Sequence, residues 1–84
     1  MVSRSNLDRL TGALMLNRGF RDAFAINRLR AIEEYDQHQK QQFHRPLDLN
    51  IDEVRIIISF PAQSPYNFIL SLEEFIIKEG LALI

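Results

Sequence analysis

The stretch from residue 64 to residue 80 constrains the fold most, because it has the pattern of a helix over several turns. Ser64 precedes Pro65, an order that places a capping side chain before a proline at the first helical position. Gly80 is a plausible helix stop. Apolar residues recur between these two points at the spacing of one helix face: Phe68, Ile69, Leu72, Phe75 and Ile76. The pattern predicts an amphipathic helix, which needs other elements to cover its apolar face.

Helical patterns also fill the first half of the chain. Ser5 is a candidate cap for the first helix. The apolar face of that helix would comprise Leu7, Leu10 and Leu14. Gly19 could end the helix, or Asn17 could cap a new one; we favour the cap, with a small kink. Asn27 repeats the Asn17 arrangement, and the polar run at 36–42 predicts an exposed helical extension.

The second half begins with a connection and a further helix start. Pro46 disfavours helix at the residue before it, so residues 43–49 are predicted to connect two helices. Asn50 and Glu53 have the spacing of a capping box. Residues 56–60 have strand composition, and a strand remains an alternative there, although no second strand is available to pair with it.

These elements predict an all-α fold, a compact bundle of four or five short helices. We expect one domain over residues 1–84, with a short apolar tail at 81–84. The residues expected to share its core are Leu10, Leu14, Phe24, Ile32, Val54, Ile57, Phe68, Leu72 and Phe75.

Composition narrows the function classes. The 84 residues include no cysteine, which excludes a disulfide framework and thiolate metal sites. No apolar run is long enough for a membrane span, and the first residues lack the apolar stretch of a secretory signal. A cytoplasmic protein with no membrane span is therefore expected.

Charge is unevenly distributed along the chain. Residues 1–30 contain six arginines and two acidic residues, whereas residues 31–84 contain four basic and nine acidic residues. One interpretation is an arginine-rich arm that binds nucleic acid. We favour the alternative that these arginines line solvated helix faces and pair with acidic residues, because the pI of about 6.1 opposes nonspecific phosphate binding. The expected acidic partners are Glu33, Glu34, Glu73 and Glu74.

Few side chains have the spacing of a reactive site. Glu34 and His38 are four residues apart and would share a helix face, but two ligands do not complete a metal site. No metal, no cofactor and no catalytic residue are expected, so the protein is not expected to be an enzyme. The phenylalanines could line a ligand slot, but aromatic residues at helical spacing are more often core.

Several segments together resemble the nitrile-hydratase-like leader peptide clan, which contains precursors of ribosomally made modified peptides. The resemblance begins with Leu7-Asp-Arg-Leu-Thr-Gly-Ala-Leu14, continues with Asn17-Arg-Gly-Phe-Arg21, and includes Ala31-Ile-Glu-Glu-Tyr35. Leu49-Asn-Ile-Asp-Glu53 and Ser71-Leu-Glu-Glu-Phe75 resemble the later elements of the family pattern. Asn-Arg replaces the customary Asp-Pro at two helix starts. The chain also shows no cleavage site and no core peptide rich in Cys, Ser or Thr.

The resemblance implies a leader-like module without a core peptide that docks on a partner protein or serves as a small subunit of a larger complex. An accessory enzyme subunit, as in ring-opening dioxygenases, is the alternative, and a nucleic-acid binder is a weaker one. A partner protein or a second copy is expected to cover apolar residues that the core does not use, and nucleic acid is not an expected partner. The candidate interface comprises Ile77, Leu81, Leu83 and Ile84.

Overall fold

The computed structural model describes residues 1–81, and these form five helices and no strand. The helices are α1 (Arg4–Leu16), α2 (Arg18–Ile26), α3 (Arg28–Gln41), α4 (Ile51–Ser59) and α5 (Pro65–Glu79). The predicted all-α bundle is therefore confirmed, and the strand alternative for residues 56–60 is excluded because α4 contains most of that segment.

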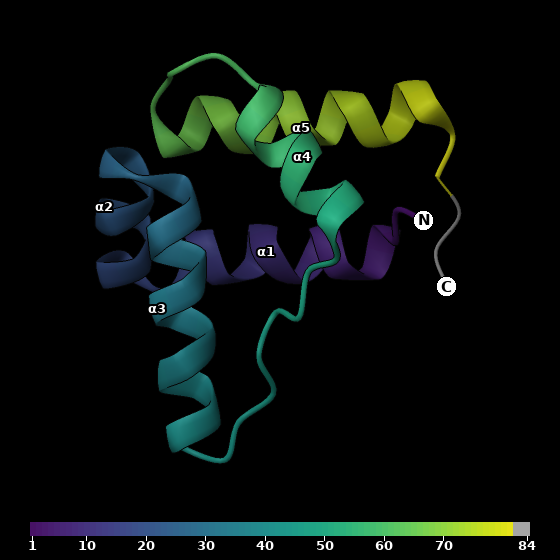
Figure 1. Cartoon of the computed structure of the whole chain (residues 1–84). Coiled ribbons are helices and arrows are strands. Elements are labelled where there is room, and N and C mark those ends of the chain that lie inside the picture. Colours follow the sequence, from purple (N-terminus) through teal and green to yellow (C-terminus); the bar gives the residue numbers. More distant parts are fainter. Residues whose placement is uncertain (82–84) are drawn as a thin grey trace.

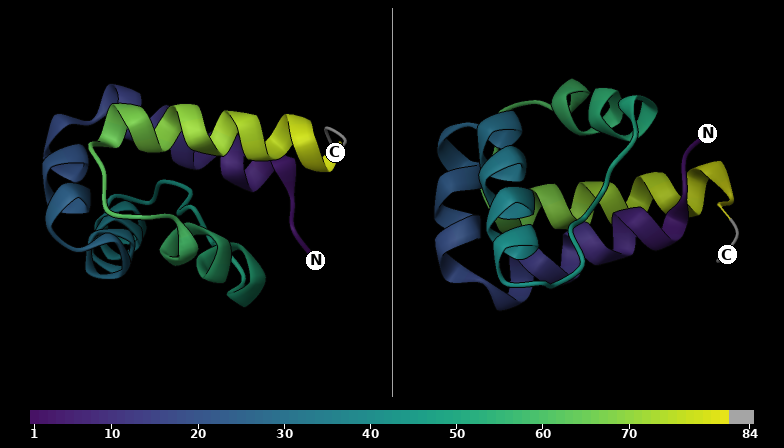
Figure 2. Two further views of the ribbon diagram at one scale, coloured as in Figure 1. Left: turned by 90° about the horizontal axis from the view of Figure 1, so that it is seen from above. Right: turned by 60° about the horizontal axis from the view of Figure 1, so that its bottom comes forward.

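The two long helices at the ends of the chain lie side by side. Figures 1 and 2 show α5 running along α1 in the opposite direction. The pair α2 and α3 packs across one end of these two helices, and α4 lies on the other side of the core from α5 (Figure 2). An extended connection between α3 and α4 returns the chain to the body of the molecule. The last turns of α3 project away from the core, as the polar run at 36–42 predicted.

Side-chain caps separate consecutive helices, largely where the sequence predicts them. Asn17 and Asn27 each accept a hydrogen bond from the backbone N–H three residues later, at 2.9 and 3.1 Å. Ser64 does the same ahead of Pro65, and Gly80 ends α5 with a left-handed φ of 63°. The predicted cap at Ser5 is wrong, because Ser3 caps α1 and Ser5 lies within its first turn.

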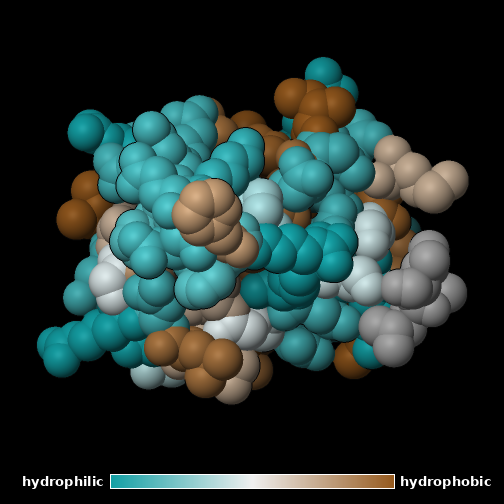
Figure 3. Space-filling model, turned by 90° about the horizontal axis from the view of Figure 1, so that it is seen from below, coloured by the Kyte–Doolittle hydropathy of each residue, from teal (hydrophilic) through white to brown (hydrophobic). Residues whose placement is uncertain are grey.

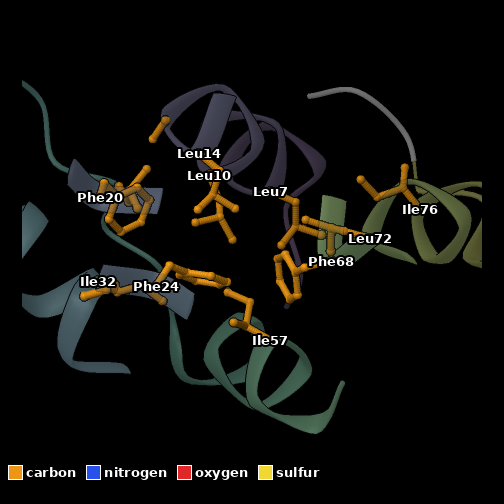
Figure 4. Packing of buried hydrophobic residues seen from close by; sticks show 13 residues of the cluster. Leu7, Leu10, Leu14, Phe20, Phe24, Ile32, Ile57, Phe68, Leu72 and Ile76 are labelled. Atoms are coloured by element: carbon orange, nitrogen blue, oxygen red, sulfur yellow. The ribbon is translucent and has the colours of Figure 1, made fainter. Parts of the chain in front are cut away.

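The core contains most of the residues expected there. Buried side chains from all five helices meet between α1, α5 and α4 (Figure 4). The prediction is wrong at Val54, which is only half-buried; Glu53 takes the buried position beside it, while Phe75 is half-buried against the core. Leu47, which the sequence placed in a connection, is buried. The buried apolar residues are Leu7, Leu10, Ala13, Leu14, Phe20, Phe24, Ala31, Ile32, Leu47, Ile57, Phe68, Leu72 and Ile76.

Aromatic side chains form a continuous series of ring contacts through the molecule. The series runs from Tyr35 through Phe20 and Phe24 to Phe68, with centroid distances of 4.6, 5.8 and 4.9 Å. Phe60 continues it at 5.4 Å from Phe68, and Phe75 lies a further 6.1 Å away. Phe43, by contrast, is 96% exposed. The six aromatic residues of this series thus connect the helices through ring contacts.

A buried carboxylate joins the start of the chain to α4. Glu53 is fully buried and accepts hydrogen bonds from the backbone N–H groups of Ser3, at 2.7 Å, and Asn50, at 2.9 Å. The side-chain amide of Asn6 donates to the same carboxylate at 2.9 and 3.2 Å. Asn50 completes the predicted capping box by accepting from the Glu53 backbone N–H. One side chain therefore caps α4 and attaches α1 to it.

At its other end, α4 is attached by Arg28. The guanidinium donates hydrogen bonds to the carbonyl oxygens of Ile57 and Phe60, both at 2.8 Å, and of Pro61, at 2.7 Å. It also lies 4.9 Å from the ring centre of Phe68. Burial lowers the pKa of Arg28, because the charged form loses hydration. The guanidinium remains charged and neutralises the partial negative charge at the end of α4.

Replacing Arg28 with methionine is expected to lower the free energy of unfolding by about 2 kcal/mol, since charge-assisted hydrogen bonds to helix-end carbonyls are lost while the apolar stem remains. Chemical denaturation measures this change. The matched control is Arg30→Met, which removes an exposed ion pair with Glu34 and should cost less than about 0.5 kcal/mol. Equal effects of the two substitutions would show that the carbonyl contacts of Arg28 contribute little.

Candidate interaction surface

The residues predicted to contact a partner differ in their placement. Ile77 lies on α5 and is 77% exposed. Leu81 follows the end of α5, is half-buried and packs against the core, so less of its surface is available. Leu83 and Ile84 lie outside the described residues. Within residues 1–81, Ile77 is therefore the predicted interface residue with the most accessible side chain.

Ile77 belongs to a longer exposed stripe on α5. Tyr66 and Leu70 are each 62% exposed, and they precede Ile77 by eleven and seven residues. Residues spaced four, seven and eleven apart fall on one face of an α-helix, and Glu73 is the fourth exposed residue on that face. The opposite face carries the buried side chains Phe68, Leu72 and Ile76. We call Tyr66, Leu70, Glu73 and Ile77 the α5 outer surface.

Arg21 fixes one end of the α5 outer surface. Its guanidinium donates to the carbonyl oxygens of Leu14 and Met15, both at 3.2 Å, at the end of α1. The same group lies 5.5 Å from the ring centre of Tyr66. The guanidinium of Arg21 therefore joins the end of α1 to the start of α5, beside Tyr66.

Tyr66 and Leu70 were not among the predicted interface residues, although their spacing in the sequence contains a signal for them. They form a second apolar stripe with Ile77, on the face of α5 opposite to the core stripe. Two such stripes on one helix indicate apolar surface beyond what a one-sided core can bury.

On the face seen from below, away from α5, hydrophobic atoms form separate areas in a mainly hydrophilic surface (Figure 3).

The Glu34 and His38 pair does lie together, in a groove between α2 and α3. The groove has a volume of about 280 Å³, and its lining includes Phe20, Ala23 and Tyr35. Glu34 accepts a hydrogen bond from Arg30 at 2.9 Å, so its carboxylate already has a cationic partner. In the described part of the chain, no three His, Asp, Glu or Cys residues are grouped as metal ligands.

All six arginines of the first thirty residues have intramolecular partners. Arg4, Arg18 and Arg30 form ion pairs with the acidic residue four positions later, at 3.7, 3.8 and 2.9 Å. Arg9 donates to the Asn6 side chain and to the Leu47 carbonyl, and Arg21 and Arg28 donate to helix-end carbonyls. Of the expected acidic partners, Glu34 is confirmed. Glu33, Glu73 and Glu74 form no ion pair within residues 1–81, because the first two helices supply their own carboxylates, Asp8 and Asp22.

Comparison with known proteins returns no family model, no curated protein and no solved structure that matches this chain. Among the helices described, none is both long and apolar enough to cross a membrane.

Proposed function

We propose that this protein is a noncatalytic helical docking module that binds a partner protein through the α5 outer surface. The observation that carries the proposal is the second apolar stripe on α5, formed by Tyr66, Leu70 and Ile77, which the domain's own core does not cover. Apolar side chains gathered on one face gain free energy when another surface removes them from water.

The proposed role agrees with the resemblance to leader peptides. A leader-like module would either dock on a maturation enzyme or remain as a small subunit of a larger complex. A role in nucleic-acid binding is not part of the proposal, because the arginines that would contact phosphates are engaged within the molecule. The carboxylate of Glu73 on the α5 outer surface would also repel phosphate groups.

The test is the double substitution Leu70→Asp with Ile77→Asp. Native mass spectrometry of the wild-type assembly from its source identifies the partner, and titration then gives dissociation constants for each variant. We expect the variant to retain helical dichroism and to bind at least about tenfold more weakly, because two charges would be buried in an apolar contact.

The matched control places the same substitutions at two other exposed isoleucines, Ile51→Asp and Ile58→Asp on α4. This control should bind the partner as the wild type does. If the α4 variant loses binding and the α5 variant retains it, the partner docks on α4 and the proposed surface is wrong.

A further inference from the structure

Two carboxylates, one on the α5 outer surface and one beside it, form no ion pair in the described part of the chain. Glu73 belongs to the α5 outer surface, and Glu74 is the exposed residue next to it. Neither forms an ion pair within residues 1–81. The other helices pair Asp8, Asp22 and Glu34 with an arginine four residues earlier. In α5 the corresponding positions are Ile69 and Leu70. Lys78 follows Glu74 by four residues but forms no ion pair with it.

We propose that the partner of the α5 outer surface is an amphipathic helix that carries lysine or arginine beside its apolar stripe. This inference rests on the proposed function and specifies the chemistry of the partner. Covering Tyr66, Leu70 and Ile77 also removes water from Glu73, which lies between them. Desolvating a carboxylate is costly unless a cation faces it, so a neutral or acidic partner would bind poorly.

A second copy of the chain fits this surface less well. The stripe has its centre between Leu70 and Glu73, so two antiparallel copies of α5 would bring Glu73 and Glu74 of both chains together at the middle of the contact. Four carboxylates gathered in a partly desolvated interface repel one another. An anionic membrane surface is disfavoured for the same reason. A basic amphipathic helix satisfies both the apolar residues and the two carboxylates.

The test uses a display library of 18-residue helices with leucine fixed at positions i, i+4, i+7 and i+11 and all other positions randomised. The full chain selects binders, and the sign of the enriched charges is read from their sequences. We expect wild-type protein to enrich lysine and arginine beside the leucines. A selected peptide should bind about tenfold more tightly than its Lys→Glu counterpart at low salt, with amide shift changes along α5.

The double substitution Glu73→Lys with Glu74→Lys should reverse the preference toward acidic peptides. Its control is Glu33→Lys with Gln37→Lys and Gln41→Lys, three exposed positions on α3 that change the net charge by the same amount. This control should leave the basic preference unchanged. A reversal in the control as well would mean that net charge, not the α5 surface, selects the peptide, and would overturn the inference.

Other outcomes separate this inference from the proposed function. If selected peptides show no charge bias yet lose binding to the variant with Leu70→Asp and Ile77→Asp, the docking surface stands and the basic partner is wrong. If sedimentation shows that the chain self-associates through α5 and the library yields no binder, a second copy covers the surface and the inference is overturned. If neither the library peptides nor the native partner binds α5, both the basic-helix inference and the proposed docking function are wrong.

Discussion

Replacing Glu53 with alanine is expected to lower the free energy of unfolding by roughly 3 to 5 kcal/mol. The substitution removes a buried carboxylate that accepts from Ser3, Asn50 and Asn6, and it leaves two partly buried backbone N–H groups without this acceptor. A domain of this size has a total stability of roughly 4 to 12 kcal/mol, so the variant would lose a large part of it. Thermal and chemical unfolding followed by dichroism measure the change.

The Glu53→Gln variant distinguishes the contribution of the Glu53 charge to stability from that of the side-chain volume. It retains the side-chain volume and one acceptor oxygen, but its amide N–H₂ group would face a backbone N–H that needs an acceptor. We expect the free energy of unfolding to lie between the values of the wild type and of Glu53→Ala. We also expect faster hydrogen exchange at the amides of Ser3 and Asn50. Faster exchange confined to these amides would show that the start of the chain detaches from α4 before the domain unfolds.

The control for charge is Asp52→Asn, at the neighbouring position on the surface. Asp52 contacts the N-terminal ammonium group at 2.7 Å, and this hydrogen bond and charge lower the pKa of Asp52. Because the contact is exposed, its loss should leave the melting temperature close to that of the wild type. If Asp52→Asn and Glu53→Ala destabilise the domain equally, burial of Glu53 is not what makes it important.

The local signals in the sequence predicted the helices well, because caps and stops act over a few residues. Asn17, Asn27 and Ser64 each contact a backbone N–H only three positions away, so their spacing is visible in the sequence. The choice of Ser3 over Ser5 as the first cap depends on Glu53, fifty residues distant from Ser3, which accepts from the Ser3 backbone N–H. A local pattern contains no information about that contact.

The buried face of α4 could not be predicted for a different reason. Its apolar residues occur on nearly every side of the helix, so the spacing does not specify which side faces the core. The structure turns Ile57 and Glu53 inward and leaves Ile51 and Ile58 exposed. The hydrogen bonds of Glu53 to the start of the chain and of Arg28 to the end of α4 make this orientation favourable. Both involve residues far apart in the sequence.

The candidate site was predicted only in part. Ile77 could be recognised as a residue in excess of the core stripe, because the core stripe of α5 is clear in the sequence. Tyr66 and Leu70 form a second stripe with Ile77 that the spacing contains, but only the tertiary structure shows that α5 packs against α1 and α2 on one side and leaves that stripe exposed. The contact of Arg21 with Tyr66 likewise depends on tertiary structure.

Phe68 gives the second large expected effect, because it lies where the helices meet. Its ring is fully buried, 4.9 Å from Phe24 and 5.4 Å from Phe60, and the Arg28 guanidinium lies over it (Figure 4 shows Phe24 and Phe68). Phe68→Ala would leave a cavity and remove these ring contacts, so we expect a loss of roughly 3 to 5 kcal/mol in the free energy of unfolding. Urea denaturation measures this loss.

Two controls distinguish the cavity from the loss of an aromatic ring. Phe68→Leu fills most of the volume and should cost about 1.5 kcal/mol or less, whereas Phe43→Ala, at an exposed position, should change stability by less than about 0.5 kcal/mol. Because Phe68 faces the core while Tyr66 and Leu70 face outward, Phe68→Ala should also weaken partner binding by loosening α5. A variant that is destabilised as expected yet binds the partner as tightly as wild type would show that docking does not depend on how α5 packs.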